Sequence, residues 1–281
     1  MRQNGVKNSN KRNFYAMAIS AAVVLASLAL SIFSFFFYIP SKEARLYEDI
    51  IKKYPLIDPA QGLYKKEDLI VDFQPLRNDL EKIGARRSLS IYFEYLPTGA
   101  NINVNKDLAI WPASLIKVPI AMAAMKKVEN GTWKLSNELV ILDVDKDKDY
   151  GTLFKKPSGT TITIEDLLKE SLINSDNTAH FVLLRNLENS EIEDLYDHLG
   201  LEDVLEALKK SPSANSSDNR ITAKRYSIFF RSLYKSTYLS PEYSEKFLDL
   251  LSQNTDNRYL AGVMPMKDIS MKVYKYVSEY K

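Results

Sequence analysis

A serine and a lysine stand three residues apart in an otherwise apolar stretch, WPASLIKVPIAM, which runs from Trp111 to Met122. At this spacing Ser114 and Lys117 share one face of the start of a helix. A lysine in apolar surroundings loses solvation of its charged form, so its pKa falls and it can be a neutral base near pH 7. A serine hydroxyl becomes a useful nucleophile beside such a base. The alternative is a helix-capping serine and a lysine whose ammonium reaches water.

A second set of polar residues follows an apolar helix pattern and precedes another. The segment ESLINSDNTAHFVLL contains Ser175, Asp176 and Asn177 in succession. A serine and an amide at a corner between two helices can point back into a cleft, where the hydroxyl can relay a proton. The amide can bind a substrate carbonyl group.

An S-x-x-K motif on a buried helix, followed about sixty residues later by S-D-N, resembles the serine β-lactamase and penicillin-binding protein superfamily. The flanking segments ENGTWKLSNEL, TITIEDLLKESLINSDNTA and HLGL are similar to class A β-lactamases, and the resemblance runs from about Pro75 to the end. It implies that Ser114 is the nucleophile and Lys117 its base. It also implies that Ser175 relays a proton to the leaving amine and that Asn177 binds the substrate amide.

The chain departs from this family in the loop that carries E-P-x-L-N in class A enzymes. Here the segment reads SPSAN, with Ser211 at the position of the glutamate and Asn215 matching the asparagine that holds the hydrolytic water. A serine cannot act as a carboxylate base. The resemblance therefore implies acylation at Ser114 with impaired deacylation, and Asn215 as a residue that positions water.

The C-terminal residues depart from the family as well. The family carries K-[ST]-G on a strand, whereas this chain offers Lys275 in KYVS, with Lys272 as a poorer candidate and no glycine in either place. Only three residues follow Ser278. We expect the final strands and the C-terminal helix to be missing through truncation or a frame-shift.

Tyr150 matches the aromatic residue that gates the family's cleft or is a plain loop tyrosine.

The elements around these residues predict an α/β protein of the α+β type. Alternating β-formers with a turn at Pro97–Gly99 predict a hairpin over 88–105. The apolar stretch predicts a central helix ending near Val128. Thr163 is a predicted N-cap. Further helices are expected over 75–83, 163–172, 177–187, 191–199, 201–210, 223–234 and 241–252, and a strand over 268–276. The resemblance implies a β-lactamase-like fold, with an antiparallel sheet flanked by helices and an all-α subdomain.

The N-terminus predicts one membrane-spanning helix ahead of this fold. A basic tail without acidic residues precedes 26 uncharged residues, enough to cross a bilayer of about 30 Å. A cleaved signal peptide is the alternative, although its apolar part is usually shorter. We expect a cell-membrane, single-pass protein with an extracytoplasmic catalytic domain. The predicted ranges are a cytoplasmic tail (1–12), a transmembrane anchor (13–39), a stalk (40–74) and a catalytic domain incomplete at its C-terminus (75–281).

The composition excludes several other classes of function. The chain has no cysteine, which excludes thiolate chemistry and disulfides, and its formal net charge of +2 gives no support to nucleic-acid binding. Its two histidines lie far from any acidic cluster, so no metal is expected. No cofactor is implied, and we expect a monomer. The expected partner is a small-molecule β-lactam or a peptidoglycan stem peptide. A penicillin-binding protein with D,D-peptidase activity and a β-lactam sensor without turnover remain alternatives.

Overall fold

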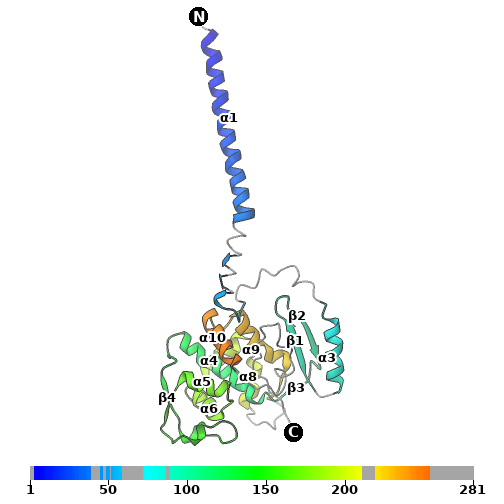
Figure 1. The fold of residues 1–281 in the computed structure, drawn as a ribbon, viewed down its shortest axis with the longest axis vertical. Helices are drawn as coiled ribbons and strands as arrows, with labels where there is room; N and C mark the ends of the chain where they lie inside the picture. The colour runs from blue at the N-terminus through cyan, green and yellow to red at the C-terminus, as the bar shows by residue number, and fades with distance from the viewer. Residues whose placement is uncertain are drawn as a thin grey trace. The chain divides into compact units, whose positions relative to one another are not determined.

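The computed structural model describes residues 3–38, 45–46, 49–50, 52–58, 72–86, 89–210 and 219–253. The chain divides into two compact units, residues 1–53 and 54–281. The helical elements (η marks 3-10 or π turns) are α1 (Gln3–Phe33), η1 (Ser34–Tyr38), α3 (Gln74–Arg86), η3 (Ala113–Ile116), α4 (Lys117–Glu129), η4 (Asp143–Asp145), η5 (Leu153–Lys155), α5 (Ile164–Leu172), α6 (Asn177–Arg185), α7 (Asn189–His198), α8 (Glu202–Lys210), α9 (Ala223–Lys235) and α10 (Pro241–Ser252) (Figure 1). The strands are β1 (Ile91–Tyr95), β2 (Ala100–Val104), β3 (Ala109–Ile110), β4 (Glu138–Val140), β5 (Thr161–Thr163) and β6 (Ile221–Thr222).

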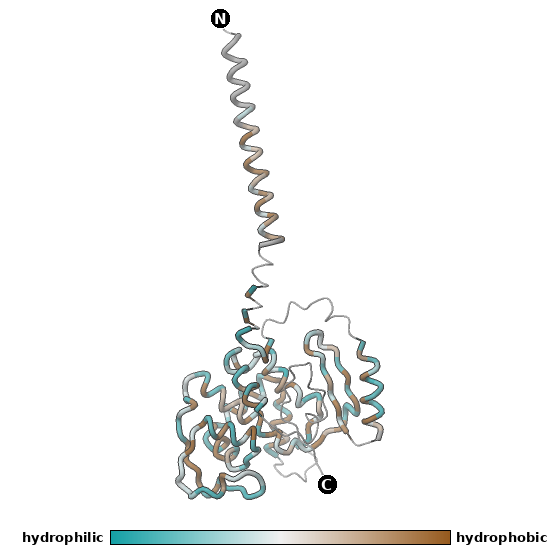
Figure 2. Tube along the Cα trace, viewed as in Figure 1, coloured by the Kyte–Doolittle hydropathy of each residue, from teal (hydrophilic) through white to brown (hydrophobic). Residues whose placement is uncertain are grey.

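The first unit is dominated by the long apolar helix α1. Its most apolar part, with the turn that follows, covers Met17–Phe36, has a mean hydropathy of 2.3 and is not buried inside the protein. Figure 2 shows hydrophobic residues along the second half of α1. By length and composition this helix can cross a bilayer, and a signal sequence near an N-terminus has the same two properties.

The second unit begins with residues that pack against its last helices. The backbone N–H of Leu56 donates to Glu245 Oε2 at 2.9 Å, and the N–H of Asp58 donates to the carbonyl of Tyr234 at 2.8 Å. Ile57 between them is buried in the core. Residues 54–58 of the segment predicted as a stalk are therefore part of the body of this unit. The other residues described in that range do not test the predicted boundaries.

The predicted hairpin is confirmed. Strands β1 and β2 pair antiparallel, with Ile91 opposite Val104 and Tyr95 opposite Ala100. The turn is closed by the N–H of Gly99 donating to the carbonyl of Tyr95 at 2.9 Å, and Gly99 has a φ of 71° that glycine adopts without strain. Helix α3, predicted from its apolar spacing, contacts β2.

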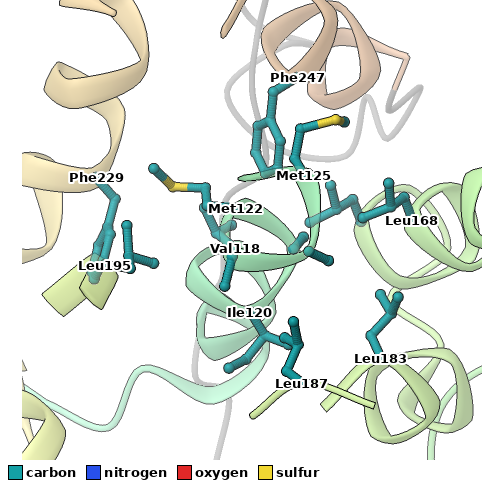
Figure 3. Packing of buried hydrophobic residues seen from close by; sticks show 14 of the residues in the cluster. Val118, Ile120, Met122, Met125, Leu168, Leu183, Leu187, Leu195, Phe229 and Phe247 are labelled. Atoms are coloured by element: carbon teal, nitrogen blue, oxygen red, sulfur yellow. The ribbon is translucent and has the colours of Figure 1, made fainter. Parts of the chain in front are cut away.

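Helix α4 is the centre of the hydrophobic core, as its nearly all-apolar composition predicts. Ten of its residues are buried. It contacts helices α5, α6, α7 and α10. Figure 3 shows Met122 and Met125 of this helix surrounded by labelled side chains of the neighbouring helices, among them Phe229 of α9 and Phe247 of α10. Because neighbouring helices pack around α4, the side chains of its first turn, including Lys117, start from a fixed backbone.

The surrounding helices begin where polar caps predict. Thr163 accepts from the N–H of Asp166 at 3.1 Å and caps α5, which confirms the predicted N-cap. Asp176 caps α6 and Thr222 caps α9 in the same way, by accepting backbone N–H groups of the first turn. The observed helix bounds differ from the predicted ones by at most two residues, except that α3 ends at Arg86, three residues after its predicted end.

The sheet structure of the described residues consists of three two-stranded antiparallel ladders. Besides the hairpin, β3 pairs with β6 and β4 pairs with β5. These two short ladders were not predicted, because strands of two or three residues leave no alternating pattern in the sequence. The strand expected over 268–276 lies outside the described residues, as does the SPSAN segment over 211–215.

A buried ion pair holds the loop after β4 against α6. The Asp145 side chain is 2% exposed and accepts from Arg185 Nε at 2.7 Å and from an Arg185 terminal nitrogen at 2.9 Å. The same guanidinium donates to the carbonyl of Val140 at 2.6 Å. This bidentate geometry fixes the path of the chain as it approaches the S-D-N corner.

We expect Arg185→Met to lower the free energy of unfolding by about 3 kcal/mol, because it leaves the buried Asp145 carboxylate without its cation. The matched control is Arg77→Met, which removes an exposed pair with Glu81 at 4.0 Å and an exposed hydrogen bond to the carbonyl of Asn101 at 3.3 Å. It should cost less than about 1 kcal/mol. Urea titration of the full-length chain in detergent, followed by tryptophan fluorescence, measures both. Equal losses in the two variants would show that the Asp145 pair does not hold the loop.

Candidate active site

Ser114 lies in the 3-10 turn η3, immediately before α4, rather than in the first turn of the α-helix itself. Its neighbour Ala113 has a φ of 45°, in the left-handed region that residues other than glycine rarely occupy. The hydroxyl of Tyr226 donates to the carbonyl of Leu115 at 2.9 Å and holds the turn from α9. The turn has no side-chain cap, so the helix-capping role considered for Ser114 is wrong.

Lys117 is the first residue of α4, and its side chain is buried, with 2% of the residue exposed. Its Nζ lies 2.5 Å from the carbonyl oxygen of Ser175 and 2.5 Å from Asn177 Oδ1. The hydroxyl oxygens of Ser175 and Ser114 lie at 3.1 Å and 3.4 Å from the same nitrogen. The alternative of a lysine reaching water is therefore wrong for this residue.

The S-D-N residues form a tight corner between α5 and α6. Asp176 is fully buried and accepts from the N–H groups of Ala179 at 3.0 Å, Thr152 at 2.5 Å and Leu153 at 2.9 Å. Ser175 has a φ of 56°, so it also lies in the left-handed region. Asp176 thus stabilises the corner, while the strained backbone of Ser175 turns both its carbonyl and its hydroxyl towards Lys117.

The two motifs meet in one hydrogen-bonded group. Ser175 Oγ donates to Ser114 Oγ at 2.9 Å, which connects the two hydroxyls directly. Asn177 places its Oδ1 on Lys117, and its Nδ2 donates to Asp147 Oδ1 at 3.0 Å. The structure therefore brings together Ser114, Lys117, Ser175 and Asn177, as the sequence predicted from residues sixty positions apart.

Burial alters the ionisation of Lys117. Desolvation lowers its pKa from 10.5 to about 8, and the negative charges of Asp176 and Asp147 oppose that fall. About a tenth of the lysine is then a neutral amine at pH 7, far more than for a lysine with the ordinary value. Such an amine, within reach of two hydroxyls, can accept a proton from one of them.

The remaining predicted residues fall in different places. Tyr150 is 63% exposed and lies beside the corner through its backbone, because its carbonyl accepts from the N–H of Asn177 at 3.0 Å. Asn215 and Lys275 lie outside the described residues, so their roles stay predictions. Asp147, in the charged run VDKDKD, was not predicted as a site residue, although its carboxylate contacts Asn177. Only a knowledge of the loop path could have singled it out among four neighbouring acids.

A family described as "Beta-lactamase enzyme family" matches residues 75–276. Among curated proteins, Beta-lactamase VEB-1 of Pseudomonas aeruginosa is 29% identical over 86 residues. That match spans 30% of this chain and 29% of the relative, so it covers less than a third of the relative's length.

Solved structures are similar to this chain in fold. A beta-lactamase from Sphaerobacter thermophilus aligns with a TM-score of 0.59 and 22% identity, over 70% of this chain and 76% of its own. A mutant of PBP-A, solved as its acyl-enzyme complex with penicillin G, aligns with a TM-score of 0.56 and 23% identity. The alignment with PBP-A covers 65% of this chain and 70% of the other. Both confirm the predicted α+β architecture.

We expect Gly151→Ala to disrupt the corner. Gly151 has a φ of 97°, and a Cβ there would lie 2.0 Å from Asp176 Oδ2, so the carboxylate would be forced off its N–H donors. Hydrogen bonds to a charged group contribute roughly 1.5–3 kcal/mol each, so a loss of about 3 kcal/mol or more in unfolding free energy follows.

The control for this variant is Gly159→Ala. Gly159 has a φ of 89° and open space where the alanine methyl group would lie, so only the backbone strain of about 1–2 kcal/mol remains. Thermal unfolding of the two variants separates the effects. Equal destabilisation would show that contact with Asp176 has no part in the result.

Proposed function

Because the chain belongs to the beta-lactamase enzyme family, we propose that it is a membrane-anchored serine hydrolase that β-lactams acylate at Ser114 and that deacylates slowly. The observation that carries this proposal is the buried Lys117 amine, 3.4 Å from the Ser114 hydroxyl and 3.1 Å from that of Ser175. No cofactor takes part in the proposed reaction.

The contacts of Lys117 can accommodate its neutral form, which is the reactive one. Its two nearest partners, the Ser175 carbonyl and Asn177 Oδ1, can only accept hydrogen bonds. A neutral amine has two N–H groups for these acceptors and one lone pair, which remains for a hydroxyl. Every hydrogen-bonding capacity of the neutral amine is thus satisfied at this position.

Acylation then proceeds by proton transfers within the group. The lone pair of Lys117 takes the Ser114 proton as the hydroxyl oxygen attacks the lactam carbonyl carbon. As the ring C–N bond breaks, the leaving nitrogen takes a proton from the Ser175 hydroxyl, and the proton held by Lys117 replaces it. The 3.1 Å distance between Lys117 Nζ and the Ser175 hydroxyl oxygen supports this relay. Asn177 binds the substrate amide through Nδ2.

The slow deacylation rests on the sequence of the loop after α8. Ser211 occupies the position at which the family carries its glutamate base, and a hydroxyl with an ordinary pKa does not activate water. Asn215 would still hold a water molecule, and Lys275 would bind the substrate carboxylate. Tyr150, exposed beside the corner, would flank the bound substrate.

The anchoring is proposed from residues 13–39, with the catalytic domain outside the cytoplasm. The apolar stretch Met17–Phe36 and the basic residues before it support this orientation. A cleaved signal sequence would place the same domain in the same compartment without attachment.

Ser211 also favours a second candidate function. A protein that forms a lasting acyl-enzyme serves as a penicillin-binding protein with D,D-peptidase activity, or as a sensor that binds a β-lactam once. Release of D-alanine from a peptide ending in D-Ala-D-Ala identifies the peptidase. Its absence, together with a lasting adduct, identifies the sensor.

The test is the intact mass of the full-length chain in detergent over time with penicillin G. We expect one lasting penicillin adduct on the wild-type chain and none on Ser114→Ala, because the acyl bond forms only through the Ser114 hydroxyl. Consumption of penicillin without a lasting adduct would overturn slow deacylation but keep the hydrolase. If the chain forms no adduct and consumes no penicillin, the proposed function is overturned.

A further inference from the structure

We propose that Asp147 is a positioning residue of the acylation site: its carboxylate holds the Asn177 amide in the one orientation that serves Lys117 and the substrate together. This inference rests on the proposed function. It assigns a role to one acid of the charged run VDKDKD.

The orientation of the Asn177 amide follows from its two neighbours. On one side Nδ2 lies 3.0 Å from Asp147 Oδ1, and on the other Oδ1 lies 2.5 Å from Lys117 Nζ. A carboxylate only accepts hydrogen bonds, so it must face the NH2 group of the amide. With Asp147 present, a flipped amide would set oxygen against oxygen on one side and NH2 against the lysine amine on the other.

Asp147 is itself fixed in place. Its Oδ1 also accepts from the N–H of Asp149 at 2.8 Å, and its own N–H donates to Thr178 Oγ1 at 3.1 Å. The residue is half-buried, and the ion pair between Asp145 and Arg185 holds the chain two residues before it. The carboxylate is therefore set by the fold before a substrate arrives.

The fixed amide has a direct use in substrate binding. The Nδ2 group carries two hydrogens, and Asp147 takes one of them. The second remains as the donor for the substrate carbonyl that Asn177 is proposed to bind. Asp147 thus acts through Asn177 and has no contact with the reacting atoms.

Asp147 also contributes charge to the site. The groups facing Lys117 are Ser114 from η3, Ser175 and Asp176 from the corner, Asn177 from α6, and Asp147 from the loop. Burial lowers the pKa of Lys117, and the carboxylates of Asp176 and Asp147 raise it in part. Asp176 is shared among three backbone N–H groups, whereas Asp147 can be neutralised by substitution without loss of a cap.

The experiment measures the acylation rate of the full-length chain in detergent with a fluorescent penicillin between pH 5 and pH 10. For Asp147→Asn, which keeps a carbonyl acceptor for Asn177, we expect a smaller fall in the maximal rate than for Asp147→Ala. The rise of the rate with pH should move about one pH unit lower, because a neighbouring negative charge no longer favours protonated Lys117. For Asp147→Ala, which also frees the amide, we expect a maximal rate at least about tenfold lower.

The matched control is Asp149→Asn, which removes an equal charge from an exposed residue of the same run. It should leave both the rate and its pH dependence unchanged. The inference is overturned if Asp147→Asn and Asp149→Asn behave alike, or if Asp147→Ala acylates at the wild-type rate.

A chain that is not acylated at all would overturn the proposed function rather than the position of Asp147. The side-chain titration of Lys117, observed by 13C NMR of lysine labelled at Cε and assigned with Lys117→Gln, then decides the inference. A lower midpoint in Asp147→Asn, and not in Asp149→Asn, supports it. Equal midpoints in all three chains overturn it.

Discussion

The burial of one lysine amine is the constraint on which the rest of this site depends. Lys117 Nζ is removed from water at the first residue of the central helix, and its nearest neighbours are the two acceptors at 2.5 Å. A buried ammonium is costly, so the amine tends towards its neutral form. The neutral form is also the one that can take a proton from a serine. Burial and reactivity are thus two consequences of one placement.

The surrounding fold keeps this placement rigid. Helix α4 is packed on all sides by other helices, which fixes the lysine (Figure 3). Two left-handed residues, Ala113 and Ser175, bring the hydroxyls to the amine, and each costs of order 1–3 kcal/mol. Asp176 offsets part of that cost by gathering three backbone N–H groups. For Ser175, the strained residue and the carboxylate that stabilises its corner are adjacent in the sequence.

Features that depend on a few neighbouring residues could be predicted from the sequence. The hairpin, the buried helix and the Thr163 cap depend on residue spacing and side-chain type, and all three are confirmed. The meeting of Ser114 with Ser175 was predicted through motif order. The contact of Asp147 with Asn177 was not, because thirty residues separate them and the loop path depends on an ion pair and on Gly151. The left-handed Ala113 and Ser175 carry no mark in the sequence either, since neither is a glycine.

The ionisation of Lys117 is the most direct test of the account. It is measured on the full-length wild-type chain with lysine labelled by 13C at Cε, with Lys117→Gln to assign the resonance. The account predicts a titration midpoint of about 8, well below the 10.5 of an ordinary lysine. A midpoint near 10.5 would contradict it, because the amine would then be protonated at every physiological pH and could not activate Ser114.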